Sequence, residues 1–461
     1  MFLKSPKSIS LTRESSTAPQ WNNQAIFRLV WPLVIEQLLA LAMGAADTVM
    51  VSSVGEFAVS GVHVVDSINN LLVIAFMALA TGGAVVVSQY IGRSDTKSAH
   101  LASKQLIYAV TAVSVLIMVI SMLFRRSIIW LLYGTLEDTV MEAASLYFLI
   151  TALSYPFLAV YNANAALFRA AGNSKVPMKI ALLVNILNIG GNAFFIFGLH
   201  IGVAGAAFST LISRLIAAVI TCTLLMRTND MLSLSGILKI KFVPAMIRKI
   251  LNVGIPSGIE SSMFMIGKLL TQKIFTTFGT AAIAGNAIAS VINSFSFMPG
   301  NAYGIALLTL VGQSVGLGDY AAARKNTIKI MKVSYLTVFI MSSFTLIFME
   351  PLIGMFNLSA QAHNFTKTFL SVHCISMIIG WSMSFVLPNA LRASGDARYV
   401  MVVAAISMWT VRVSLSYLLS YTFKVGPLGV WIAMGSDFIS RGTCYYIRWV
   451  KGAWQKKKVV D

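Results

Sequence analysis

The sequence predicts an all-α polytopic membrane protein with about twelve transmembrane helices in two homologous six-helix bundles. Hydrophobic residues make up 57% of the chain and charged residues only 11%, whereas ordinary soluble domains carry about 25% charged residues. The apolar residues gather in runs of about 20 residues or more, the length that crosses a bilayer as a helix. In addition, the second half of the chain repeats the pattern of the first.

The bundles are predicted over residues 24–226 and 250–450, joined by a basic, less apolar cytoplasmic linker at 227–249. A polar tail, residues 1–23, precedes them without a signal-peptide cleavage pattern, and a basic tail, residues 451–461, follows. The apolar runs of the first bundle lie at about 27–50, 58–90, 104–124, 143–168, 177–198 and 203–226. Those of the second bundle lie at about 250–275, 281–314, 331–354, 366–391, 400–423 and 427–450.

The charge distribution indicates membrane topology rather than nucleic-acid binding. The formal net charge is +19, but the basic residues lie in short segments between apolar runs and not on one continuous face. If both ends are cytoplasmic, most of the loop Lys and Arg fall on the inner side, as the positive-inside rule requires. Arg125 and Arg126 are the visible exception. We therefore expect a multi-pass protein of the cell (inner) membrane with both termini in the cytoplasm.

Several classes of site are not indicated by the motifs. The three cysteines, Cys222, Cys374 and Cys444, lie within apolar runs without a CxxC, which favours core packing over a disulfide framework or a zinc site. There is no GxxxxGK[ST] phosphate loop, and no HExxH, GxSxG or paired His/Asp cluster. We therefore expect neither an enzyme nor an ATP-driven protein, and no cofactor.

The repeat keeps one offset over six spans. Subtracting 224 superposes Pro256 on Pro32, Glu260 on Glu36, Gln313 on Gln89, and Asp319 on Asp95. With an offset of 223, RASGD at Arg392 matches RAAGN at Arg169. Since six spans return the chain to the same side, the bundles are expected to be parallel, and such pairs of bundles suit alternating access around a site near the membrane midplane.

Two acids interrupt the first apolar run, Glu36 and Asp47. A carboxylate at the bilayer centre costs roughly 2.5–3.5 kcal/mol, so an intramembrane acid indicates an ion or proton site. At about 100° per residue, their spacing places both acids on one helix face, about 16 Å apart along the axis. In the repeat Glu260 matches Glu36, but Thr271 stands where Asp47 falls, which favours Asp47 as the coupling residue. The alternative for Glu36 is a neutral acid hydrogen-bonded to a neighbouring helix.

Two bases lie in apolar runs of the second half. Lys268 follows Glu260 by two turns on the same helix, so it pairs either with Glu260 or with another acid, as a structural salt bridge or as a gate. Arg412, in WTVRVSL, is interpreted as structural.

Several of these motifs together resemble multidrug and toxic compound extrusion (MATE) transporters over nearly the whole chain. They are the first-helix proline followed by Asp47-Thr48, the segments SQYIGRSD and GQSVGLGD, and the segments RAAGN and RASGD. The resemblance implies a V-shaped pair of six-helix bundles that exports amphipathic, often cationic compounds in exchange for sodium ions or protons. Its expected partners are such small molecules and membrane lipid, and we expect a monomer.

The resemblance also implies a cation site in the first bundle, at Asp47, Asn188, Asn192 and Thr210. All four are oxygen donors, as a hard cation such as sodium prefers, and Asn188 and Asn192 share a helix face. Some family members have a second acid where this chain has Asn192. The alternative is that the two Asn and Thr210 only join helices.

In the second bundle, Glu260 matches an acid that is important in one branch of the family. That branch has an aspartate about where this chain has Trp381, so a cation cage is incomplete here, and Glu260 is left to cycle a proton or to bind a cationic compound. A flippase for lipid-linked oligosaccharides or other lipids is the alternative function. It would need a more basic cavity to hold pyrophosphate than Lys268, Arg412, Arg214 and Arg441 provide.

Overall fold

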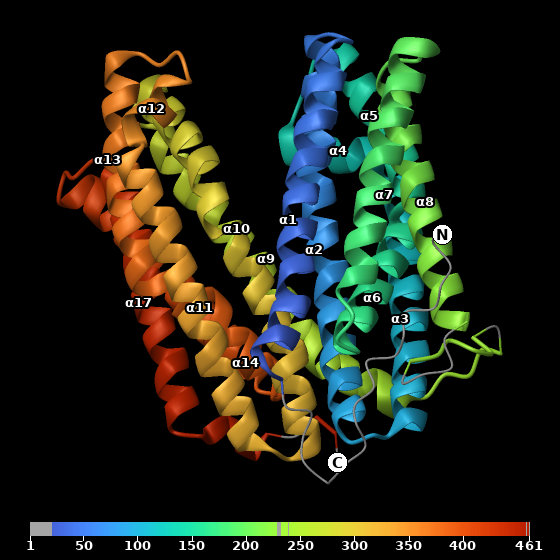
Figure 1. Cartoon of the computed structure of the whole chain (residues 1–461). Helices are drawn as coiled ribbons and strands as arrows, with labels where there is room; N and C mark the ends of the chain where they lie inside the picture. The colour runs from blue at the N-terminus through green and yellow to red at the C-terminus, as the bar shows by residue number, and fades with distance from the viewer. Residues whose placement is uncertain (1–20, 228–231, 238, 458, 461) are drawn as a thin grey trace.

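The computed structural model describes residues 21–227, 232–237, 239–457 and 459–460, which form a helical V of two legs (Figure 1). The legs converge at the end that carries α14 and diverge toward the end that carries α12. The first leg, the N-lobe, comprises α1 (Asn23–Ser52), α2 (Glu56–Gly92), α3 (Thr96–Leu123), α4 (Arg125–Tyr133), α5 (Asp138–Leu153), α6 (Tyr155–Ala170), α7 (Lys175–Asn192), the π-helical η1 (Ala193–Gly198) and α8 (Val203–Arg227).

The second leg, the C-lobe, is built in the same order, with more π-helical stretches. It comprises α9 (Pro244–Thr276), α10 (Thr280–Leu317), α11 (Tyr320–Ile347), α12 (Met349–Gly354), α13 (Ala360–Ser376), η2 (Met377–Val386), α14 (Leu387–Ala393), α15 (Ala397–Ser407), η3 (Met408–Val413), α16 (Ser414–Tyr417), η4 (Leu418–Thr422), α17 (Leu428–Val450) and the short η5 (Ala453–Lys456).

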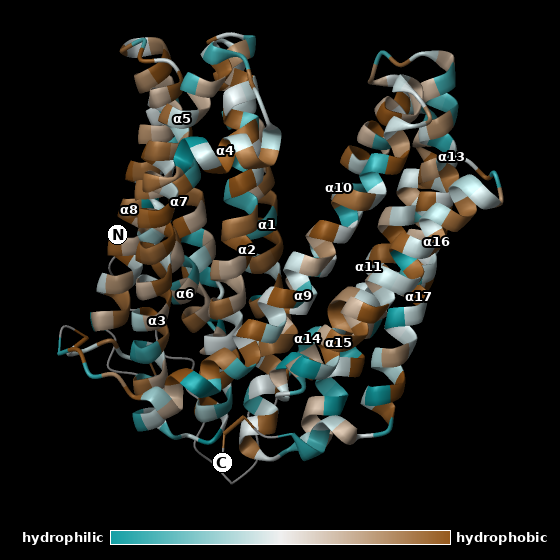
Figure 2. Ribbon diagram, turned by 180° about the vertical axis from the view of Figure 1, so that it is seen from behind, coloured by the Kyte–Doolittle hydropathy of each residue, from teal (hydrophilic) through white to brown (hydrophobic). Residues whose placement is uncertain are grey.

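A helical segment is present at each of the twelve predicted spans. Within the described residues, nine helices, some of them continuous across π-helical segments, are long and apolar enough to cross a membrane, and α5 with α6, bent by 48°, adds a tenth. With α9 and α17, each lobe has six such helical segments. These two helices are less apolar, because Glu260 and Lys268 lie in α9 and Asp437 and Arg441 lie in α17. Most of the helical ribbon is hydrophobic, and hydrophilic residues are frequent at the converging end (Figure 2).

Some helices begin earlier than the apolar runs predict. α3 begins at Thr96 and α11 at Tyr320, because Asp95 and Asp319 cap them: their side chains accept hydrogen bonds from Ser98 N (3.0 Å) and Ala322 N (2.8 Å). The first turns of these helices are polar, so the apolar runs begin later than the helices do. Likewise α9 begins at Pro244, inside the predicted linker 227–249, of which residues 228–231 and 238 lie outside the described part. Residues 1–20 of the predicted amino-terminal tail also lie outside it.

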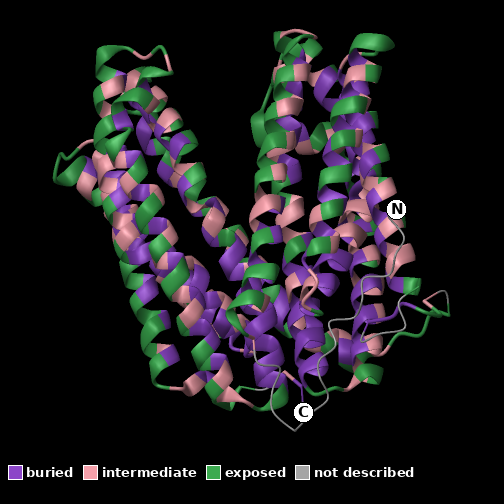
Figure 3. Cartoon of the chain, viewed as in Figure 1, coloured by how far each residue is buried: buried purple, intermediate pink, exposed green. Residues whose placement is uncertain are grey.

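The first turns of the first helix of each lobe pack in the core of the other lobe. Leu29 and Leu33 of α1 belong to a buried cluster with Leu307 and Leu310 of α10, and Ile250 of α9 belongs to the N-lobe cluster. Buried residues are accordingly concentrated where the legs meet (Figure 3). The two lobes are therefore packed together at one end by reciprocal insertion of equivalent segments, and the upper part of α1 stays with the N-lobe through α7.

Candidate functional site

The centre of the N-lobe site is Asp47, on the upper part of α1. Its Oδ1 accepts a hydrogen bond of 2.5 Å from Nδ2 of Asn192, the last residue of α7, which is fully buried. The sequence spacing does not establish this contact, since 145 residues separate the two. The predicted neighbourhood of Asp47 and Asn192 is confirmed.

The other two predicted ligands, Asn188 and Thr210, lie on α7 and α8. Asn188 donates from Nδ2 to Thr210 Oγ1 of α8 over 3.3 Å, and its backbone carbonyl accepts from Ser209 Oγ over 2.7 Å. The side-chain carbonyl oxygens of Asn188 and Asn192 are buried and have no hydrogen-bond donor. A buried oxygen without a partner is unfavourable, and these two amide groups, one of them in contact with the Asp47 carboxylate, form a donor set that suits a hard cation. Among the described residues no cluster of three His, Cys, Asp or Glu side chains offers an alternative metal site.

A second acidic group next to Asp47 was missed by the sequence analysis. Asp66 of α2 and Arg214 of α8 both lie close enough to Asp47 to interact with it electrostatically. Asp66 accepts a hydrogen bond of 3.4 Å from Asn69, whose own oxygen accepts from the Tyr155 hydroxyl over 2.7 Å. The signal was available, because Asp66 is a lone acid in the apolar segment VHVVDSINN. Two acids and one guanidinium leave this site with an excess of negative charge.

Glu36 and Glu260 are not part of that site. Glu36 forms an ion pair with Arg169 at the end of α6, and Glu260 forms the equivalent pair with Arg392 of α14, with an N–O distance of 2.6 Å. The interpretation of Glu36 as a neutral acid is therefore replaced by a salt bridge. The pairing of Glu260 with Lys268 is wrong, because the chain folds the RASGD loop back onto α9 and brings Arg392 to the carboxylate instead.

Trp381, the position compared with a family aspartate, serves packing in this chain. It is 4% exposed, stacks between Phe297 and Phe385, and lies so close to Gly300 that a Cβ there would collide with its ring. With Glu260 engaged by Arg392, the second lobe presents no acidic cage at this position.

Arg412 and Lys268 belong to a different cluster, near the middle of the C-lobe. Arg412 of η3 and Arg441 of α17 both approach Asp437, a fully buried acid of α17, and Lys268 lies near Arg412. Asp437 was not among the predicted site residues, although it is an acid in the apolar segment MGSDFIS, as Asp66 is in its own segment.

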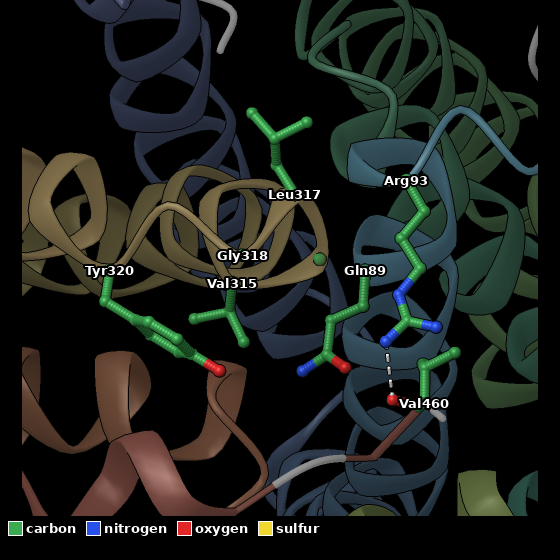
Figure 4. A pocket seen from close by; sticks show the side chains of 8 residues that line it. Gln89, Arg93, Val315, Leu317, Gly318, Tyr320 and Val460 are labelled. Carbon is green, nitrogen blue, oxygen red and sulfur yellow. Dashed lines mark hydrogen bonds between the residues drawn. The ribbon is translucent and has the colours of Figure 1, made fainter. Parts of the chain in front are cut away.

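The converging ends of the lobes are joined by a symmetric set of hydrogen bonds. Gln89 Nε2 of α2 donates to the Ala393 carbonyl over 2.7 Å, and Gln313 Nε2 of α10 donates to the Ala170 carbonyl over 2.8 Å. Beside them is a cavity of about 280 Å³ (Figure 4). There Arg93 donates to the carbonyl of Val460, so the described carboxyl-terminal residues also contact the N-lobe.

The repeat seen in the residues also appears in a family comparison. The MatE family model matches the chain twice, over residues 32–194 and 256–418, the same 224-residue offset that relates Pro32 to Pro256. The chain belongs to the MATE family of membrane transporters. It is thus a transporter and not an enzyme, and the relatives it matches include proteins named for multidrug resistance and export.

Relatives of this MATE protein match over almost the whole chain. An uncharacterized transporter of Bacillus subtilis, YisQ, is 30% identical and covers 94% of this chain and 95% of its own. A probable multidrug resistance protein NorM of Thermotoga maritima is 26% identical and covers 94% of each chain. A solved structure titled as the outward-facing conformation of a multidrug resistance MATE family transporter superposes with a TM-score of 0.85 at 18% identity, over 93% of this chain and 94% of its own.

Proposed function

We propose that this MATE protein is a secondary active antiporter of the cell (inner) membrane, which exports amphipathic compounds in exchange for a cation bound at Asp47. The observation that carries the proposal is the donor set of the N-lobe. The Asp47 carboxylate on α1 contacts the buried side chain of Asn192, and the side-chain oxygens of Asn192 and of Asn188, one turn earlier on α7, have no hydrogen-bond donor. In the interior of a membrane protein such a group is retained for ion or proton movement.

Sodium satisfies this arrangement better than a proton does. A proton on Asp47 would create one O–H donor, which satisfies at most one of the two buried amide oxygens. A sodium ion takes several oxygen ligands at once, and Asp47, Asn188, Asn192 and Thr210 supply only oxygen. We therefore favour sodium as the exchanged ion and make proton exchange an outcome of the test.

α1 supplies the connection between ion binding and lobe movement. Its upper part holds Asp47 against α7, and its first turns, with Leu29 and Leu33, are packed into the C-lobe cluster. A change in the contact between Asp47 and α7 therefore affects α1, a helix that is packed against both lobes. If ion binding weakens the affinity for the exported compound, linkage requires that the compound weaken ion binding by the same factor.

Charge distribution supports a cytoplasmic location for the converging end. The loops there contain most of the basic residues between spans, including Arg93, Lys175 and Arg324. With that end inside, both termini are cytoplasmic and the diverging legs open outward. We propose that a single chain, surrounded by lipid, performs the exchange.

Dye efflux from proteoliposomes, with each gradient applied singly, tests the proposal. A sodium gradient at constant pH is expected to drive dye movement without ATP, and a pH gradient without sodium is expected to drive little. Movement driven only by the pH gradient would replace sodium by the proton. Scrambling of lipid without any gradient, together with no gradient-driven dye movement, would contradict antiport and support a flippase.

A further inference from the structure

The C-lobe contains two buried arginines and only one acid to neutralise them. Arg412 Nη1 lies 3.7 Å and Arg441 Nη2 lies 3.6 Å from the same oxygen, Asp437 Oδ2. Both distances exceed those of a charge-assisted hydrogen bond. The other oxygen of Asp437 accepts from Ser407 Oγ over 2.6 Å, so the carboxylate is held by α15 rather than by the guanidinium groups.

Most donors of the two guanidinium groups are unused. Nε and Nη1 of Arg412, and Nε and Nη2 of Arg441, are buried without any hydrogen-bond partner. Aromatic rings cover part of both groups, with Phe264 below Arg412 at 5.1 Å and Phe385 below Arg441 at 4.5 Å. These contacts fix the orientation of the guanidinium planes but do not satisfy their N–H groups. Asp437 Oδ2 likewise has no hydrogen-bond partner, so a single carboxylate oxygen lies opposite two guanidinium groups, and most of their N–H groups are left for a further acceptor.

Lys268 adds a third positive charge on the side that faces the other lobe. On α9, Ile250, Gly254 and Gly258 form the stripe that packs against α2 near Gly82 and Ala78. At helical spacing this stripe continues through Met265 to Lys268, which is exposed and close enough to Arg412 for their charges to repel. Lys268 is thus the exposed member of the cluster, and Arg412 and Arg441 are buried behind it.

The charges of the two lobes are opposite. Glu36 and Glu260 are neutralised by Arg169 and Arg392. The charges that remain within the N-lobe site are those of Asp47, Asp66 and Arg214, two negative and one positive. In the C-lobe three positive charges remain beside the single acid Asp437. These three residues, Lys268, Arg412 and Arg441, are called the basic cluster. A cation is therefore favoured in one leg and an anionic group in the other.

We propose that the basic cluster binds the carboxylate of the transported compound, so that the substrates are amphiphiles carrying an acid group, whether zwitterionic or anionic. This inference rests on the proposed function and specifies its substrate class. Two planar guanidinium groups with free N–H donors match the two oxygens of a carboxylate, and Lys268 provides the entry charge. The surrounding Phe264 and Phe385 suit an apolar body attached to that acid group.

Equilibrium binding of a matched dye pair tests this inference. Rhodamine B has a free carboxylate, and its ethyl ester keeps the same xanthylium cation without the acid. Fluorescence polarisation with the purified full chain in nanodiscs of neutral lipid measures both affinities. We expect the acid to bind at least about tenfold more tightly than the ester, since hydrogen bonds to a charged group contribute about 1.5–3 kcal/mol.

Variants assign the preference to the cluster. Arg412→Gln is expected to reduce the acid-to-ester affinity ratio to near one, and Arg412→Lys, which keeps the charge, to restore part of it. Lys268→Gln changes an exposed side chain, so it tests the cluster without risk to folding, and it is expected to lower the ratio as well. Lys273→Gln is the control, because Lys273 is an exposed lysine of the same helix. Equal binding of acid and ester by the wild type, or a ratio unchanged in both Arg412→Gln and Lys268→Gln, would overturn the proposal.

Free anions are distinguished by chloride titration against gluconate. If chloride displaces the acid dye but not the ester, the carboxylate occupies an anion site and the proposal stands. If chloride binds in a manner that depends on Arg412 while neither dye responds to Arg412→Gln, the cluster holds an inorganic anion only and the substrate claim is overturned. Because equilibrium binding needs no gradient, a failure of antiport leaves the ratio intact, and a failure of this inference leaves gradient-driven transport intact.

Discussion

The side chain of Gln89 in the N-lobe donates a hydrogen bond of 2.7 Å to the backbone carbonyl of Ala393 in the C-lobe. The repeat places Gln313 at the equivalent position in α10, and it donates to Ala170, the counterpart of Ala393, over 2.8 Å. Each lobe therefore uses an equivalent glutamine to bind the last helical residue of the fourth or tenth span in the other lobe. This reciprocal pair, the glutamine latch, joins the lobes at their converging ends.

Removal of the glutamine latch is expected to favour separation of the converging ends. One buried hydrogen bond contributes about 0.5–1.5 kcal/mol, so Gln89→Ala with Gln313→Ala should shift the equilibrium between conformations by about five- to 150-fold. Spin labels at Leu131 and Met355, which are 76% and 78% exposed on the diverging ends, report the change as a shorter distance distribution. Asn164→Ala is the control, because the buried Asn164 of α6 donates to Thr221 of α8 within the N-lobe. An unchanged distribution in the double variant would argue against the latch.

Gly92 permits the closest approach of the two lobes. A Cβ at this position would collide with the backbone of Gln313, and Gly316 has the same relationship to Gln89. Because backbone cannot move aside as a flexible side chain does, Gly92→Ala should destabilise this conformation by about 1–3 kcal/mol. The same spin-label pair measures the shift. Gly190→Ala, a helical site with open space around it, should leave the distances unchanged, and an equal effect of both substitutions would refute the explanation.

The ion pair of Glu36 with Arg169 is expected to contribute to folding rather than to transport chemistry. Removing one partner of a buried pair costs about 3–5 kcal/mol, and the 16% side-chain exposure of Arg169 places this pair at the lower end. Glu36→Gln should therefore lower the Tm of the purified protein, and Glu36→Gln with Arg169→Gln should recover part of the loss. Glu350→Gln, which breaks the exposed pair with Lys367, should leave the Tm unchanged. A Tm unaffected by Glu36→Gln would contradict a structural role.

The architecture was predictable because its signals are local or periodic. Apolar runs predict spans whatever their partners are, and the 224-residue repeat relates the lobes without any structure. The proximity of Asp47 to Asn192 followed from the family resemblance and is confirmed. The role of Asp47 in coupling stays a prediction.

The ion-pair partners were not predictable from spacing. Arg169 and Arg392 lie at the ends of spans, where a basic residue is also explained by topology, and each meets its acid only after more than 130 residues of chain have folded back. Lys268 and Glu260 lie on the same helix, and this suggested that they form an ion pair. Lys268 instead lies on the face of α9 that is turned toward the other lobe. Asp66 and Asp437 are also acids within apolar runs, which indicates an intramembrane site. This indication was used only for the acids of the first helix of each half.

Sodium binding to the purified protein tests the central claim, that Asp47 is the ion site, most directly. Equilibrium binding of radioactive sodium compares the wild type with Asp47→Asn and with Glu260→Gln, whose acid is already held by Arg392. We expect the wild type and Glu260→Gln to bind sodium alike and Asp47→Asn to lose binding while remaining folded and monodisperse. Sodium binding by Asp47→Asn at the wild-type level, or its loss in Glu260→Gln instead, would contradict the assignment.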